Sequence, residues 1–229
     1  WGVKERLLQE KTAIGFYLSG HLFDEVEAEV RRFVRTKIAE LQDSREPQLL
    51  CGIVSELRVI NGQRGRLGLF KLDDKSRAIE ASADEALLDA HRELLKDDEF
   101  VLVSGRLQLD HFSGGLRVKV QQLWSLADAR CRFGRYLHLP VGAQGPALLP
   151  QLARLLQEFA PRRQETEHGE LLQGLRLRLS LQCPAAAPGQ EGAQAELQLG
   201  EGVRFYPCDA ALAAWSAQAE GGLAQVVYD

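Results

Sequence analysis

The stretch from Gln48 to Trp124 constrains the fold more than any other part of the chain, because its β-like runs are regularly spaced. Five short runs alternate apolar with polar residues, and turn-forming residues separate them. One helical run, Asp84–Leu95, falls between the third and the fourth. The predicted strands are Leu49–Ile60, Arg66–Asp74, Arg77–Ala83, Glu99–Asp110 and Gly115–Trp124. Three strands, a helix and two further strands predict a small closed barrel.

This order of elements is that of an OB-fold, a five-stranded Greek-key barrel that typically binds oligonucleotides. The helical run places its leucines on one stripe, so we expect it to close the bottom of the barrel. Residues 47–130 are therefore assigned to an OB-fold nucleic-acid-binding domain.

The flanking residues predict a mixed β and α+β chain. Residues 1–46 show a helical spacing of apolar residues and are interpreted as a helical connector. Residues 131–229 predict a small α+β domain, with elements in the order strand, helix, three strands, helix, strand. Those elements are Tyr136–Val141, Pro146–Phe159, Leu171–Gln182, Glu196–Leu199, Val203–Tyr206, Asp209–Gln218 and Ala224–Tyr228. Because the chain begins at Trp1 and contains no Met, we expect it to be a piece of a longer protein.

Composition excludes several classes of protein. The net charge is −4, and none of the three segments is basic overall, so any contact with nucleic acid must use a local face. The four cysteines lie far apart without a CxxC pair, which predicts reduced thiols and no metal or other cofactor. No apolar run approaches the ~18 residues of a membrane span, so we expect a cytoplasmic protein with no membrane contact.

Catalytic motifs are absent from the sequence. Asp73 and Asp74 are adjacent at a strand end, where a turn cap is a better interpretation than a metal site, since neighbouring residues on a strand point to opposite faces. The glycines of Gly62–Gly68 lack the order of a phosphate-binding loop. Whether the parent protein is an enzyme stays open, but this piece is expected to carry no catalytic residue.

A binding surface is the remaining prediction. OB barrels bind single strands on the face of strands two and three, between the loops that follow strands one and four. Basic residues there would contact phosphates, and one loop aromatic would stack on a base. The predicted nucleic-acid-binding residues are Arg58, Arg64, Arg66, Lys71, Arg77, Phe112, Arg117 and Lys119. A solvated basic rim on a structural barrel is the alternative.

Four segments resemble one known family. They are EKTAIGFYLSGHLFDE (Glu10–Glu25), GRLGLFKLDDKS (Gly65–Ser76), VSGRLQLDHFSGGLRV (Val103–Val118) and VRFYPCDAALAAW (Val203–Trp215). Together they resemble the C-terminal region of the bacterial replicative DNA polymerase III alpha subunit. In that family the catalytic carboxylates of the DNA-directed DNA polymerase, a nucleotidyltransferase, lie upstream in a domain absent from this chain.

The resemblance implies two binding modules in the replisome. The barrel would lie near single-stranded template DNA, and the last domain would bind the tau subunit of the clamp loader, linking this chain to other replisome subunits. The apolar residues near the chain end that could contact tau are Phe205, Tyr206, Trp215 and Leu223, each of which could instead belong to the core. Leu69 departs from related barrels, which usually carry a stacking aromatic at that position; the adjacent Phe70 points to the opposite face by strand parity.

Two other functions remain open. Both domains could serve protein contacts alone, as a structural adaptor without DNA binding. The barrel could also be a tRNA-binding OB module of a synthetase, although no synthetase catalytic motif accompanies it.

Overall fold

The computed structural model describes residues 3–15, 17–62, 65–109, 114–143, 145–166, 169–183 and 192–229. The chain forms two compact units, Trp1–Leu126 and Ala127–Asp229. Each unit has a hydrophobic core of its own. The division falls a few residues before the expected boundary at residue 130, so most of helix α4 (Leu126–Phe133) belongs to the second unit.

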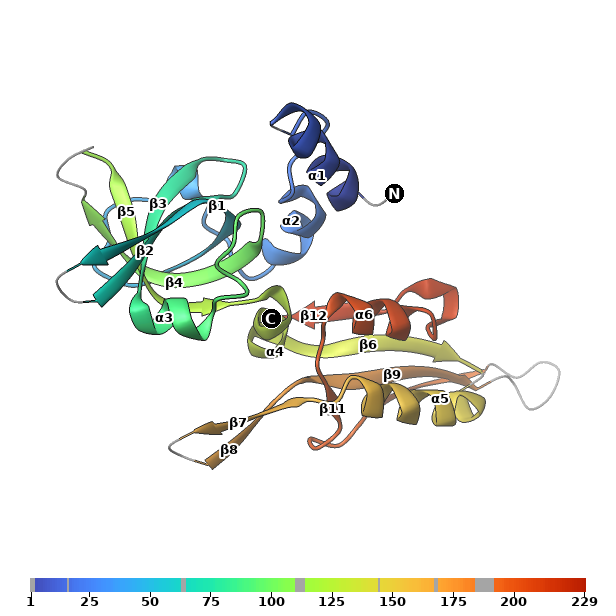
Figure 1. The fold of residues 1–229 in the computed structure, drawn as a ribbon. Helices are drawn as coiled ribbons and strands as arrows, with labels where there is room; N and C mark the ends of the chain where they lie inside the picture. The colour runs from blue at the N-terminus through green and yellow to red at the C-terminus, as the bar shows by residue number, and fades with distance from the viewer. Residues whose placement is uncertain are drawn as a thin grey trace. The chain divides into compact units, whose positions relative to one another are not determined.

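The first unit contains the closed barrel that the sequence predicts. Its strands are β1 (Gln48–Gly62), β2 (Gly65–Asp73), β3 (Ala78–Asp84), β4 (Phe100–Leu109) and β5 (Leu116–Trp124). They close in the order β1-β2-β3-β5-β4, and β3 and β5 form the one parallel pair among these neighbours (Figure 1). The OB-fold is confirmed.

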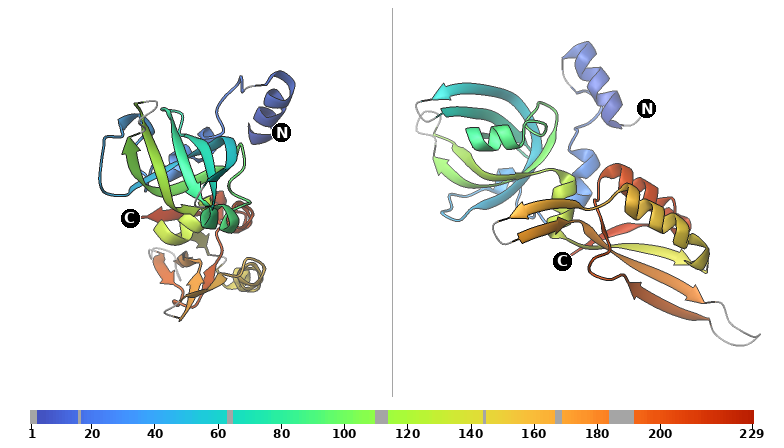
Figure 2. Two further views of the ribbon diagram at one scale, coloured as in Figure 1. Left: turned by 60° about the vertical axis from the view of Figure 1, so that its left-hand side comes forward. Right: turned by 60° about the horizontal axis from the view of Figure 1, so that its bottom comes forward.

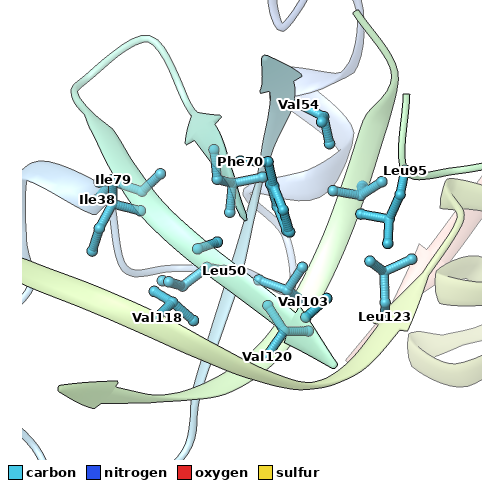
Figure 3. Packing of buried hydrophobic residues seen from close by; sticks show 14 of the residues in the cluster. Ile38, Leu50, Val54, Phe70, Ile79, Leu95, Val103, Val118, Val120 and Leu123 are labelled. Carbon is cyan, nitrogen blue, oxygen red and sulfur yellow. The ribbon is translucent and has the colours of Figure 1, made fainter. Parts of the chain in front are cut away.

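Strand alternation fills the barrel interior. Phe70 and Leu72 of β2 point inward with Val118 and Val120 of β5, and Figure 3 shows Phe70 and both valines among the side chains of the core. Leu69, between the buried Gly68 and Phe70 of β2, lies on the outer face as parity requires.

Helix α3 (Glu85–Ala90) packs against β2 beside the core. The Asp84 carboxylate accepts a hydrogen bond from the Leu87 N–H at 3.0 Å and caps the helix. Leu88 approaches β2 so closely that a Cβ added to Gly68 would lie 2.6 Å from its Cδ2. The helix is shorter than the expected Asp84–Leu95, because the chain continues as turns from His91 to Leu95, which returns to the core.

The connector belongs to the same unit as the barrel. It contains α1 (Val3–Ile14), α2 (Asp24–Val30) and the short 3-10 helix η1 (Ile38–Glu40). The Lys11 ammonium and the Tyr17 hydroxyl both donate to Asp98, at 2.6 and 2.5 Å. Phe23 packs 6.1 Å from Phe100 between ring centroids, so the connector is fastened to the barrel by both polar and apolar contacts.

Asp74, in the turn between β2 and β3, joins the connector to the barrel. It is only 1% exposed, and its Oδ2 accepts hydrogen bonds from the Arg31 guanidinium (2.7 Å) and the Ile38 N–H (3.0 Å). Its Oδ1 accepts from the hydroxyl and N–H of Ser76 and from the N–H of Arg77. Burial raises the pKa of Asp74, but the hydrogen bonds from Arg31, Ser76 and Ile38 outweigh burial and hold that pKa below its ordinary value. The carboxylate therefore has a structural role in the turn.

The second unit is a mixed sheet with helices on one face. Its strands are β6 (Gly134–Gly142), β7 (Arg162–Thr166), β8 (Gly169–Gln173), β9 (Leu175–Cys183), β10 (Ala193–Gln198), β11 (Arg204–Phe205) and β12 (Gln225–Tyr228). The helices are α5 (Gly145–Glu158), α6 (Asp209–Ser216) and the 3-10 helix η2 (Glu220–Gly222). The main sheet has the order β10-β9-β6-β12, and β11 also pairs with β9. Figure 2 shows α5 and α6 together on one face of it.

The expected strand Leu171–Gln182 is wrong, because the structure divides it at Gly174. Residues before this glycine form β8, which pairs with β7 in a separate two-stranded sheet, and residues after it form β9. A Cβ on Gly174 would lie 2.9 Å from the Cβ atoms of both Pro161 and Arg204, so only glycine fits at this change of partner.

Candidate nucleic-acid interface

The outer face of β1, β2 and β3 carries several of the predicted contact residues. Strand register places Arg58 of β1 beside Leu69 of β2, which in turn lies beside Ser82 of β3. The neighbouring row contains Lys71 and Glu80. Among the described residues of β2 and β3, the one aromatic is the buried Phe70, so these two strands offer no aromatic platform to a base.

Glu56 holds two of the predicted cations. It lies in a bulge of β1 between Ser55 and Arg58, with a left-handed φ of 55°. The Lys71 ammonium donates to its carboxylate at 2.6 Å, and the Arg58 guanidinium is 3.8 Å away. The hydrogen bond from Lys71 lowers the pKa of Glu56. A phosphate that approaches either cation must compete with this carboxylate.

Arg66 is held by the first turns of α3. Its Nε donates to Glu85 and its Nη2 donates to Asp89, each at 2.8 Å. The hydrogen bonds from Arg66 to Glu85 and then to Asp89 raise its pKa. The guanidinium therefore fixes the start of β2 to the helix.

Arg117 of β5 is likewise paired. It is the strand partner of Glu80 in the parallel β3–β5 pair, and its Nη2 donates to that carboxylate at 2.6 Å. The structure thus brings Arg58, Lys71 and Arg117 to the barrel surface as expected, each beside an acid.

Lys119 differs from these residues. Its side chain is exposed, and within the described ranges no carboxylate pairs with it. Its partner on β4 is Arg106, which is also exposed and also without an ion pair in the described part of the chain. Sequence reasoning missed Arg106. The alternation of buried Val103, Gly105 and Leu107 could have identified it as an outward residue.

Of the other predicted contact residues, the structure describes only Arg77. Arg77 is exposed in the turn before β3, on the connector side of the barrel. Arg64 and Phe112 lie outside the described residues, so their roles stay predictions.

The predicted partner-binding residues of the second unit have different environments. Phe205 and Trp215 are fully buried and pack together with ring centroids 5.2 Å apart, so a partner cannot reach either side chain in the folded domain. The Tyr206 hydroxyl donates to Asp128 at 2.9 Å, and the Arg162 guanidinium lies 3.8 Å from its ring centroid. Leu223 is 71% exposed and stays a candidate contact.

Other kinds of site find no support. Across the described ranges, no three His, Cys, Asp or Glu side chains come together in a way that could hold a metal ion. Burial raises the pKa values of Cys51 and Cys131 to about 12, so neither thiol is a poised nucleophile. None of the helices in the described part of the chain is long and apolar enough to cross a membrane.

Comparison with known proteins identifies a family for the barrel and relatives for the whole chain. A family model described as an OB-fold nucleic acid binding domain matches residues 49–126. The DNA polymerase III subunit alpha of Pseudomonas aeruginosa is 35% identical over 217 residues, which cover 90% of this chain and 16% of the relative. That of Vibrio cholerae is 35% identical over 144 residues, covering 62% of this chain and 12% of the relative. Among solved structures, the second OB-fold domain of replication protein A from Methanococcus maripaludis superposes with a TM-score of 0.32 and 21% identity, over 40% of this chain and 93% of that one.

The barrel has the OB-fold and belongs to the class described as OB-fold nucleic acid binding domains. The chain that contains it is a homologue of the DNA polymerase III alpha subunits, over about 90% of its own length. It spans 12 to 16% of the length of the relatives compared above.

Proposed function

We propose that this chain is a non-catalytic portion of a DNA polymerase III alpha subunit that binds single-stranded template DNA through its barrel. The homology over 90% of the chain carries this proposal, because it includes a barrel of the nucleic-acid-binding class. Replication of the bacterial chromosome would place the protein in the cytoplasm. The overall charge of −4 and the many ion-paired cations predict weak, salt-sensitive binding rather than tight wrapping.

A fluorescence-anisotropy titration of a labelled single-stranded oligonucleotide at low and moderate salt tests the DNA contact. We expect binding in the micromolar range that weakens steeply with salt, since phosphate contacts release counterions. Absence of binding at low salt would favour the structural adaptor. A strong preference for a tRNA loop over a DNA strand would favour the synthetase-type module.

The second part of the proposal is that the last domain binds the clamp-loader tau subunit and so links this chain to the replisome. The exposed Leu223 supports such a contact, because a side chain that is 71% exposed can be buried by a partner. Leu223→Glu should weaken tau binding at least tenfold in a calorimetric titration. Leu149→Glu, at a 59% exposed position on α5, is the matched control. Equal effects of the two substitutions would remove Leu223 from the interface.

A further inference from the structure

We infer that the outer face of the β4–β5 hairpin, at the opposed cations Arg106 and Lys119, is where the barrel contacts the phosphates of a single strand. This inference rests on the proposed DNA binding and names the surface that performs it. It moves the contact away from the face of β2 and β3, which includes the predicted Lys71, to a hairpin that contains the predicted Arg117 and Lys119.

The first observation is the contrast in pairing between cations of the barrel strands. Arg66, Lys71 and Arg117 each have a carboxylate within 2.8 Å. Arg106 and Lys119 are exposed, and no hydrogen bond or ion pair of either side chain occurs within the described ranges. These two cations are therefore available to an external anion without the loss of an internal partner.

The second observation is that the two free cations face each other. Arg106 and Lys119 are directly opposite in the antiparallel β4–β5 pair, which places their Cβ atoms about 4.5–5.5 Å apart. Like charges in this arrangement repel, and neither β4 nor β5 contains an Asp or Glu to relieve the repulsion. A phosphate between the two side chains would supply the missing negative charge.

The surrounding side chains extend the same chemistry along the hairpin. Gln108 lies two residues along β4 from Arg106, about 6.8 Å away on the same face, and faces Arg117, whose guanidinium is paired with Glu80. Arginine, lysine and glutamine all donate hydrogen bonds, whereas a phosphodiester offers only acceptors. The match is to the sugar-phosphate backbone and is independent of base identity.

The face of β2 and β3 is a poorer place for a phosphate. Its outward positions include Glu80 and Asp84, and Glu56 lies beside Lys71. Leu67 and Leu69, the uncharged outward residues of β2, have side chains that donate no hydrogen bonds. A strand on this face would have to break ion pairs and approach carboxylates.

The experiment compares two double variants of the 229-residue chain with equal loss of charge. One variant carries Arg106→Gln and Lys119→Gln, and the matched control carries Arg58→Gln and Lys71→Gln, which removes the two cations beside Glu56. Each is titrated against a fluorescein-labelled oligothymidylate at several salt concentrations, and its thermal unfolding is recorded. Unfolding provides a second readout, because removal of a repulsive pair should leave the barrel equally or more stable.

We expect the Arg106/Lys119 variant to bind at least tenfold more weakly, with the log–log salt slope reduced by about 1.4 for two lost phosphate contacts. Its melting temperature should not fall, and the control should bind within about twofold of the unchanged protein, since its two cations start in ion pairs. If the control loses as much affinity as the variant, or the variant binds normally, the hairpin surface is wrong while DNA binding by the barrel stands. If the unchanged chain shows no salt-dependent binding at low salt, the proposed function fails together with this inference.

Discussion

At the scale of single residues, neighbouring carboxylates determine which cations of the barrel are already paired and which are available to a phosphate. Glu56 forms an ion pair with Lys71 and lies near Arg58, while Glu85 and Asp89 form ion pairs with Arg66. The strand positions of these cations follow from period-two alternation, which is why the sequence predicts them. Their pairing does not follow, because Glu85 and Asp89 lie 19 and 23 residues from Arg66 in the chain and Glu56 reaches its partners from a bulge.

The buried carboxylate of Asp74 should contribute strongly to the stability of the first unit. Both of its oxygens accept hydrogen bonds, so the amide of Asp74→Asn must turn its NH₂ group toward donors in either orientation. Breaking a buried pair by removal of one partner typically costs about 3 kcal/mol or more, and we expect a loss of that size in the free energy of unfolding. The urea dependence of hydrogen exchange at barrel amides would measure this loss of unfolding free energy for the first unit alone.

The same substitution should change the acid response. The pKa of Asp74 is lowered in the folded state, so its stabilisation is present above the unfolded pKa of about 3.9 and is lost as pH falls through the folded pKa. The difference in unfolding free energy between the unchanged protein and Asp74→Asn should therefore become smaller below about pH 4. Asp73→Asn, at the neighbouring and more exposed carboxylate at the end of β2, is the control and should lower the free energy of unfolding much less. A constant difference down to pH 2 would contradict the assigned role.

At the scale of elements, the sequence predicts strands well where a strand keeps one partner. All five barrel strands begin and end within about two residues of their expected positions, because alternation ends where turn residues begin. The β8–β9 boundary is different. The strand-like, leucine-rich run continues from Leu171 through Gly174 into Leu175 and Leu177, while the pairing changes from β7 to β6. Periodicity reports which face a residue occupies and carries no information on its partner strand.

The β7–β8 hairpin is the element whose removal should be tolerated. Among the described side chains of Arg162–Glu165 and Glu170–Gln173, none belongs to the buried core of the second unit, and Leu171 is exposed. The ends are close, since a Cβ on Gly174 would lie 2.9 Å from that of Pro161. We expect replacement of residues 163–172 by a short Gly-Ser linker to shift the melting temperature by no more than a few degrees. Gly174→Val, which forces a side chain against Pro161 and Arg204, should destabilise the domain strongly in the same calorimetric experiment. Unfolding of the second unit on removal of the hairpin would show that it is a structural part of the core.

At the scale of the whole molecule, the two separate cores should allow the two proposed binding functions to be tested on separate fragments. The first core is built entirely from residues 38–123 and the second from residues 137–228, so a cut between Leu126 and Ala127 crosses neither. Chains of about 100 residues with a complete core usually unfold as single cooperative units. We therefore expect residues 1–126 and residues 127–229, produced separately, each to show one calorimetric transition.

The same two fragments divide the proposed function. Residues 1–126 contain the connector, the barrel and the opposed cations Arg106 and Lys119, and should bind oligothymidylate with an affinity within about twofold of that of the whole chain. Residues 127–229 should bind tau and show no salt-dependent affinity for DNA. Anisotropy and calorimetry on equal concentrations of both fragments provide the comparison. DNA binding by the second fragment would place the template contact outside the barrel. DNA binding by the whole chain but by neither fragment would require a surface that both units build together, and the assignment of one partner to each domain would then be wrong.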